Sequence, residues 1–377
     1  MTDKRHLPRS LKIILRMILV ILIIMGIIVL SSFIYHKVRS SEEYDFLKDN
    51  GYINSVPAGE YNLNVCIRGA DRPQHTLVGL SGMDADDMSV CIESFAKYFT
   101  DKNRVVVADR AGYGYSDDTN KPQTYERVVN DYRTALKNSG CAPPYVLMGH
   151  SYGGDYASYW QQFYPDEVEG VIYFDPAYYL GDPSVMDKEE GFWSYGNDYD
   201  AFSVVLKDLG VVRVIYDLNN ELSFCEKYSN DVKNSASRDL YMNSITTMAK
   251  SSEMELAKKN NHDFASKLKK TDIPKLYIDA SAYSKEEMIE ELRYTYKFMK
   301  DSLDAQGIDP DDEKQMDTLW EKISVNNQEA YDAVIKPYVD KLGSCEYIRI
   351  PGNHYIFEHK PEETAKACQS FLDRLDK

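Results

Sequence analysis

The sequence predicts an α/β fold in which a mostly parallel central sheet is flanked by helices on both faces. Short, continuously apolar segments alternate with helical segments from about Tyr61 to Phe174. Strands that are apolar along their whole length are typical of a parallel sheet with both faces covered. The alternation then stops, and strand character returns only at residues 275–278 and 347–350. This interruption predicts a helical cap inserted into the sheet-forming chain.

The individual elements follow from apolar spacing and from turn residues. We expect strands at residues 61–67, 76–80, 104–108, 145–149, 171–174, 275–278 and 347–350. We expect helices at residues 87–99, 124–138, 152–164 and 361–375. The predicted cap covers about residues 178–270, and a second helical insertion covers about residues 284–342. Ser284, followed three residues later by Glu287, forms a capping-box pattern that marks the start of this insertion.

The N-terminus predicts a membrane anchor. Residues 17–35 are uncharged and mainly Ile, Leu, Val and Met, and as a helix they would span roughly 28 Å, the thickness of the bilayer's hydrocarbon core. A cleaved secretory signal is the alternative, but the apolar run is longer than usual for a signal and no A-x-A-like site follows it. The basic segment 1–16 is expected in the cytoplasm. Residues 36–57 are then a tether to an extracytoplasmic domain at 58–377, which makes this a single-pass protein of the cell membrane.

Charge and cysteine content narrow the classes of partner. The net charge is −16, although residues 1–40 carry seven basic residues against one acidic residue. The remaining domain is therefore strongly acidic, which argues against binding to nucleic acid. The six cysteines are scattered without any C-x-x-C pair, which argues against a zinc site of the usual spacing.

The strongest chemical motif is G-x-S-x-G at residues 149–153, with Ser151 at its centre. It directly follows an apolar strand and opens a helix, as a nucleophile elbow requires. Such a turn lifts the serine oxygen clear of the sheet, and the helix N-terminus favours negative charge developing beside it. The alternative reading is a serine at an ordinary turn.

From about Tyr61 to the C-terminus the chain resembles the α/β-hydrolase superfamily. Besides the elbow, the resemblance rests on three further motifs in the family's order: Asp109–Asp117 (DRAGYGYSD), Gly170–Pro176 (GVIYFDP) and Pro351–His354 (PGNH). It implies that Ser151 is the nucleophile. It also implies that His354, in the loop after the last strand, is the general base.

The resemblance leaves the third triad member open between two carboxylates. Many family members place the acid after the penultimate strand, where this chain has Asp279. Some relatives, including certain haloalkane dehalogenases, carry it at the strand end that Asp175 occupies here. We assign Asp175 as the acid and keep Asp279 as the alternative. A purely structural role for Asp175 also stays open.

The oxyanion hole is expected to consist of two backbone N–H groups. One belongs to Tyr152, the residue after the nucleophile. The other is assigned to Met83 in the segment Ser81-Gly82-Met83, where Ser81 replaces a histidine that the family often has. Asp109 and Arg110 are expected to brace the site through turns at Gly112 and Gly114.

These assignments predict a serine hydrolase that cleaves a small-molecule ester, or less often an amide or peptide bond, through an acyl-enzyme on Ser151. No cofactor or metal is required. The bilayer is a further expected partner through residues 17–35, and protein partners stay open. Acyl transfer would use the same residues. A different class of interpretation is a non-catalytic extracytoplasmic binding protein, against which the presence of both Ser151 and His354 argues.

Overall fold

The computed structural model describes residues 8–83, 85, 88–188, 201–219, 242, 244, 247–281, 284–305 and 307–376. Within them, eight strands form one sheet in the order β1-β2-β4-β3-β5-β6-β7-β8. The strands are β1 (Ser55–Pro57), β2 (Asn62–Gly69), β3 (Thr76–Leu80), β4 (Arg104–Ala108), β5 (Tyr145–His150), β6 (Val168–Phe174), β7 (Lys275–Asp279) and β8 (Cys345–Arg349). The β1–β2 and β2–β4 pairs are antiparallel and the other five pairs are parallel, so the prediction of a mostly parallel sheet is confirmed.

Helices cover both faces of the sheet, as the apolar strands predicted. Every residue of β3, β5 and β7 is buried. Because successive side chains of a strand point to opposite faces, neighbouring residues enter different cores. Leu147 packs in one hydrophobic cluster, whereas Val146 and Met148 pack in the other.

The helices that flank the sheet lie close to their predicted positions. The predicted ones are α4 (Tyr125–Asn138), α5 (Gly153–Phe163) and α16 (Pro361–Leu375), and the structure adds two short helices that were not predicted, η1 (Pro165–Glu167) and α15 (Ile356–His359). The hydroxyl of Thr124 caps α4 by accepting a hydrogen bond from the Arg127 amide at 3.2 Å. The single helix expected at residues 87–99 is instead two short helices, α2 (Met88–Cys91) and α3 (Glu93–Ala96), which break where Ile92 turns into the core.

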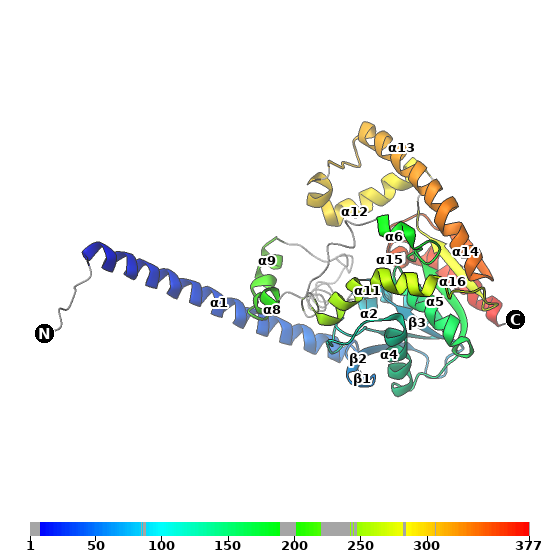
Figure 1. Cartoon of the computed structure of the whole chain (residues 1–377), viewed down its shortest axis with the longest axis horizontal. Coiled ribbons are helices and arrows are strands. Elements are labelled where there is room, and N and C mark those ends of the chain that lie inside the picture. The colour runs from blue at the N-terminus through cyan, green and yellow to red at the C-terminus, as the bar shows by residue number, and fades with distance from the viewer. Residues whose placement is uncertain are drawn as a thin grey trace.

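The cap and the insertion are helical where the structure describes them (Figure 1). The cap contributes α6 (Ser184–Lys188), α8 (Ala201–Asp208), α9 (Val211–Asn219) and α11 (Met248–Ala265), and its residues 189–200 and 220–241 lie outside the described ranges. The insertion contains α12 (Lys285–Ala305), α13 (Glu313–Ala330), η2 (Tyr331–Ile335) and α14 (Lys336–Leu342). Ser284 and Glu287 form the predicted capping box, with reciprocal bonds of 3.0 and 3.2 Å.

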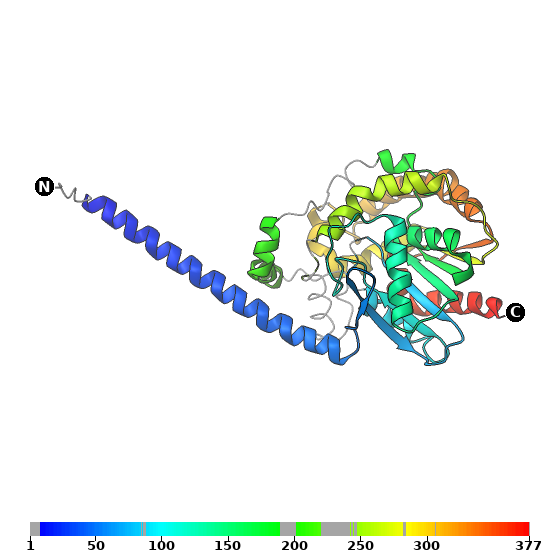
Figure 2. The same cartoon turned by 60° about the horizontal axis from the view of Figure 1, so that its bottom comes forward.

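A single helix, α1 (Arg9–Asp49), extends away from the α/β body (Figures 1 and 2). Among the described residues it is the helix long and apolar enough to cross a bilayer, and its most apolar 18-residue window has a mean hydropathy of 3.2. The expected tether at residues 36–57 differs from the structure, because α1 continues through it to Asp49 and Ser55–Pro57 forms strand β1. Arg39 lies one turn from Glu42 and Glu43, at 3.0 and 3.5 Å, and these ion pairs favour continuation of the helix.

Candidate active site

Ser151 occupies a strained turn between β5 and α5. Its φ is 51°, in the left-handed region that residues with a side chain rarely adopt. The Ser151 amide donates to the Phe174 carbonyl at 3.2 Å, and the Ala177 amide donates to the Ser151 carbonyl at 2.9 Å. The surrounding backbone therefore holds this conformation, which is the geometry of a nucleophile elbow.

The glycines of the motif allow close backbone packing around the serine. A Cβ added to Gly153 would lie 2.1 Å from the carbonyl oxygen of Leu80. A Cβ added to Gly149 would lie 2.7 Å from the Cα of Gly154. Both contacts are too short for any side chain, so the G-x-S-x-G spacing is a requirement of this turn.

His354 pairs with Asp175, the carboxylate assigned first from the sequence. The Nδ1 of His354 lies 2.7 Å from the Oδ2 of Asp175. The other oxygen, Oδ1, accepts a hydrogen bond from the Ala280 amide at 3.1 Å. Asp175 directly follows β6 and has a φ of 41°, and the His354 side chain is 48% exposed. The carboxylate therefore fixes the imidazole with Nδ1 protonated and leaves Nε2 able to accept a proton.

The alternative acid, Asp279, is directed to other partners. It is buried and accepts hydrogen bonds from the Ser281 amide at 2.8 Å and from the Arg349 Nε at 3.1 Å. The Tyr347 hydroxyl also donates to it. These hydrogen bonds hold the carboxylate of Asp279 at the end of β7, and the structure does not place it against His354.

His150 contacts the loop that carries His354, and sequence reasoning gave it no part in the site. Its ring is buried, and its Nε2 lies 3.0 Å from the carbonyl oxygen of His354. A carbonyl only accepts, so Nε2 carries the proton of a neutral imidazole. Burial lowers the pKa of His150 well below its ordinary value, and the nearby His354 lowers it further. The rings of the two histidines lie 4.6 Å apart, so His150 packs against the imidazole of His354.

Ser151 and His354 lie after the carboxyl ends of two parallel strands, β5 and β8, at the same edge of the sheet. Ser151 directly follows His150, whose ring packs on His354, and its amide bonds to Phe174, the residue before Asp175. In the described part of the chain, no hydrogen bond joins the Ser151 hydroxyl to the imidazole. Catalytic hydrogen bonds are often long in structures without substrate and shorten when substrate binds.

The predicted oxyanion loop lies against the elbow. A Cβ added to Gly82 would be 2.9 Å from the Cβ of Ser151, so only glycine allows this approach. Across the described residues, the backbone N–H groups of Met83 and Tyr152 donate no hydrogen bond to the protein. Both amides are therefore available to an oxygen atom beside Ser151.

Arg110 holds this loop through a buried network that the sequence did not reveal. Its Nη1 donates to the Ser81 carbonyl at 2.6 Å and its Nη2 donates to the Gly82 carbonyl at 2.8 Å. Its Nε lies 2.8 Å from Glu253 of α11. The hydroxyls of Tyr113 and Tyr156 donate to the same carboxylate. From the sequence, Asp109 and Arg110 were expected to brace the site through turns. The sequence did not predict that the Arg110 side chain itself holds the neighbouring loop.

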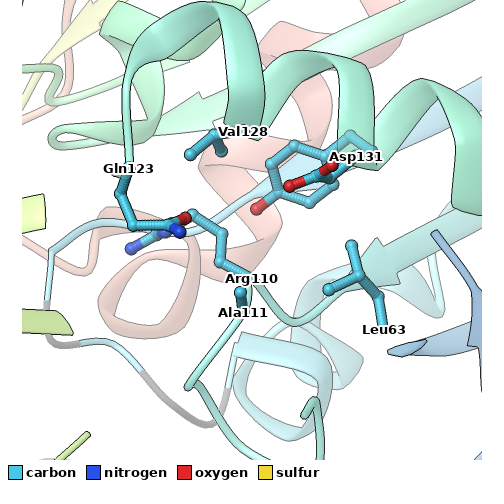
Figure 3. Close-up of a pocket in the computed structure, with 7 residues that line it drawn as sticks. Leu63, Arg110, Ala111, Gln123, Val128 and Asp131 are labelled. Carbon is cyan, nitrogen blue, oxygen red and sulfur yellow. The ribbon is translucent and has the colours of Figure 1, made fainter. Parts of the chain in front are cut away.

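The Arg110 guanidinium is almost completely removed from water, with 2% of the side chain exposed. Figure 3 shows it beneath α4, beside Gln123 and Val128. The gap between Arg110 and α4 has no space for a water molecule. The counter-charge of Glu253 holds the pKa of Arg110 well above its ordinary value despite burial. The Arg110–Glu253 ion pair is therefore excluded from water, and its stability depends on its protein partners.

Asp175 influences one further carboxylate. Burial, together with the charge of Asp175, raises the pKa of Glu291, in α12, to about 7. Near neutral pH Glu291 is therefore partly protonated, which limits its repulsion of Asp175. Within the described ranges, no group of three or more His, Cys, Asp or Glu side chains is arranged to hold a metal ion.

Comparison with curated proteins yields relatives without an assigned activity. Uncharacterized protein YbdG of Bacillus subtilis is 35% identical over 145 residues, which are 38% of this chain and 43% of that protein. Uncharacterized protein YqjL of the same organism is 32% identical over 82 residues, 22% of this chain and 32% of that protein. The matched segments thus span less than half the length of either relative.

Solved structures match most of the chain. Their sequence identities to it are low, so the likeness shows the fold alone. The enol-lactonase from Burkholderia xenovorans superposes with a TM-score of 0.53 at 15% identity, covering 85% of this chain and all (100%) of its own. A Salmonella enterica protein described as an acyltransferase superposes with a TM-score of 0.56 at 15% identity, covering 86% of this chain and 97% of its own. Residues 75–309, more than half of the sequence, match the profile of the alpha/beta hydrolase fold family. The chain therefore belongs to the α/β-hydrolase family.

Proposed function

We propose that this protein is a membrane-anchored serine hydrolase that cleaves an ester bond, or less readily an amide bond. The observation that carries the proposal is the strained Ser151 turn beside the His354–Asp175 pair, whose atoms lie 2.7 Å apart. A positive φ at a serine between a buried strand and a helix is a costly conformation. An activated nucleophile gives a chemical reason for it.

In the proposed reaction, the Ser151 oxygen attacks the substrate carbonyl while Nε2 of His354 takes the hydroxyl proton. Asp175 holds the imidazole in the required tautomer and stabilises its positive charge. The Met83 and Tyr152 amides donate to the oxyanion. His354 then protonates the leaving alcohol or amine, which leaves an acyl group on Ser151. Water, activated by His354, attacks the acyl group, and the acid product leaves.

The anchor belongs to the same proposal. Residues 17–35 of α1 are exposed along almost their whole length and carry no charge, which suits contact with lipid acyl chains. The basic residues before this span favour a cytoplasmic N-terminus and an extracytoplasmic hydrolase domain.

Reactivity of the serine tests the catalytic proposal directly. We expect a fluorophosphonate probe to label the full-length protein in detergent micelles, because only an activated hydroxyl attacks such an electrophile. Labelling should be lost in Ser151→Ala and strongly reduced in His354→Ala. Ser370→Ala removes an exposed hydroxyl of α16 and should label like the unchanged protein. Gel fluorescence and the mass of the labelled peptide measure both extent and position.

A folded native protein that resists labelling would contradict the catalytic proposal and favour a tethered binding protein. If labelling is normal, acyl transfer is separated from hydrolysis by the product. Hydrolysis releases the free acid in water, whereas a transferase accumulates a new ester or amide only when an alcohol or amine acceptor is supplied.

A further inference from the structure

Cap helix α9 packs against α1, and α8 packs against α9, so this helix pair lies beside α1 and apart from the hydrolase body (Figures 1 and 2). Their connecting turn fits closely to the long helix. A Cβ added to Gly210 would lie 2.4 Å from the carbonyl oxygen of Ser32. Beside it, Leu209 forms an open apolar groove with Gly26, Val29 and Phe33 of α1. This contact therefore lies on the segment predicted to enter the bilayer.

A buried polar clamp fixes α9 to α1 one to three turns further along. Arg213 is 1% exposed, and its Nη1 lies 2.8 Å from the Glu43 carboxylate. Its Nε donates to the His36 Nδ1 at 3.1 Å and its Nη2 donates to the Ser40 hydroxyl at 3.0 Å. Burying a guanidinium is costly unless its charge and its donors are all matched. This matching defines one docked position for the helix pair.

The docked helix pair carries three large apolar side chains that are exposed. Phe202 is 68% exposed, Val205 is 52% exposed and Ile215 is 50% exposed. Helices of a water-soluble cap normally turn such residues inward. Here the turn between the two helices contacts α1, most of whose residues from Met17 to Ile34 are themselves exposed and apolar. The helix pair and the predicted span therefore both carry apolar side chains outside the protein core.

The position of the helix-pair contact along α1 matches the depth at which amphipathic helices lie in a membrane surface. The apolar contacts centre on Val29 and the polar clamp begins at His36, so they lie on opposite sides of Tyr35, the end of the predicted span. Val29 precedes Tyr35 by six residues, or roughly 9 Å at about 1.5 Å per residue. Amphipathic helices at a membrane surface bury their apolar face by about 5–10 Å. The clamp would then lie in the polar headgroup region.

We propose that α8 and α9 form a membrane-surface hairpin whose apolar face, including Phe202, Val205 and Ile215, inserts into the bilayer leaflet next to the hydrolase domain. The partner of this surface is lipid, and the Arg213 clamp holds the hairpin at the correct height. The hairpin is part of the cap, so it holds the cap at the membrane surface. This inference rests on the proposed anchoring of α1 and adds a second, separate membrane contact.

Depth-dependent tryptophan quenching in vesicles tests the hairpin. The full-length protein is reconstituted in phosphatidylcholine vesicles containing lipids brominated at shallow or deep acyl positions. Three single variants are compared: Phe202→Trp on the hairpin, Ile24→Trp within the span and Lys259→Trp on the exposed face of α11. The unchanged protein, which has three tryptophans, supplies the background. We expect shallow-brominated lipid to quench Phe202→Trp several-fold more than Lys259→Trp, and iodide in the water to show the reverse order.

The Ile24→Trp variant distinguishes failure of the hairpin proposal from failure of the proposed α1 anchor. Quenching of Ile24→Trp by deep-brominated lipid without lipid quenching at Phe202→Trp would overturn the hairpin and leave the anchor standing. Absence of lipid quenching at both positions would overturn the anchor. A Phe202→Trp residue shielded from lipid and from iodide would indicate a protein contact and would also overturn the lipid assignment.

The clamp provides a second, independent measurement. In the Phe202→Trp background, Arg213→Ala should reduce lipid quenching at position 202 because the hairpin loses its fixed height. Arg293→Ala, which removes an exposed arginine of α12 paired with Asp311, should leave the quenching unchanged. Equal quenching in both backgrounds would show that the clamp does not hold the hairpin.

Discussion

Asp175→Asn is expected to lower kcat for a p-nitrophenyl ester by about 10⁴-fold, because an asparagine amide cannot hold the imidazole in the tautomer that accepts the serine proton. Asp175 makes a 2.7 Å contact with Nδ1 of His354, and its second oxygen accepts the Ala280 amide. The replacement has nearly the same shape, so KM and the thermal unfolding midpoint should change little. The measurement is steady-state kinetics on the purified full-length protein, with fluorophosphonate labelling rate as a second readout.

Asp279→Asn is the matched control at the neighbouring strand end. Asp279 pairs with Arg349 at 3.1 Å and accepts the Tyr347 hydroxyl, so its loss should act on stability. A buried donor left without its charged partner costs about 1–3 kcal/mol, which predicts a lower unfolding midpoint with kcat within a few-fold of the native value. If Asp279→Asn abolishes turnover while Asp175→Asn retains it, the assignment of the acid is wrong.

The sheet could be predicted from sequence because its signal is local. Each buried strand is a short run of apolar residues, and runs such as residues 145–149 lie between clear turns or helices. The elbow could also be placed, since a G-x-S-x-G motif needs only the strand before it and the helix after it. The Asp175–His354 pair was expected from the resemblance to the family, and the topology of the sheet explains the contact. The carboxyl ends of parallel strands meet at one edge of a sheet, so β6 and β8 bring their loops together.

The network around Arg110 could not be predicted, because its partners lie far apart in the chain. Arg110 and Glu253 are separated by 143 positions, and nothing in the local pattern of α11 distinguishes Glu253 from a solvent-exposed acid. The same holds for His150, whose partner is the backbone carbonyl of His354, which every residue type possesses. The extent of α1 was underestimated for a related reason. Residues 36–49 are polar, and their helix packs against α9 from a distant part of the sequence.

The Arg110–Glu253 pair connects the cap helix α11 with the proposed oxyanion loop, and separating the two charges should affect both stability and catalysis. Glu253→Leu leaves a buried guanidinium without its counter-charge, and breaking such a pair by removing one partner costs about 3–5 kcal/mol. We expect a correspondingly lower free energy of unfolding, measured by urea denaturation of the detergent-solubilised protein. Because Arg110 donates to the Ser81 and Gly82 carbonyls, kcat should fall as the loop loses its fixed position.

The double variant Arg110→Met/Glu253→Leu separates these two effects. Replacing both charges by apolar side chains of similar volume is often neutral for stability, so much of the lost free energy of unfolding should return. Catalysis should not return, because methionine donates no hydrogen bond to the loop that carries the Met83 amide. Loss of one oxyanion donor lowers kcat by about 10²–10³-fold, and this sets the size of the remaining defect. Recovery of kcat together with stability would show that Arg110 acts only as packing beneath the site. Recovery of stability alone would show that it positions the oxyanion hole.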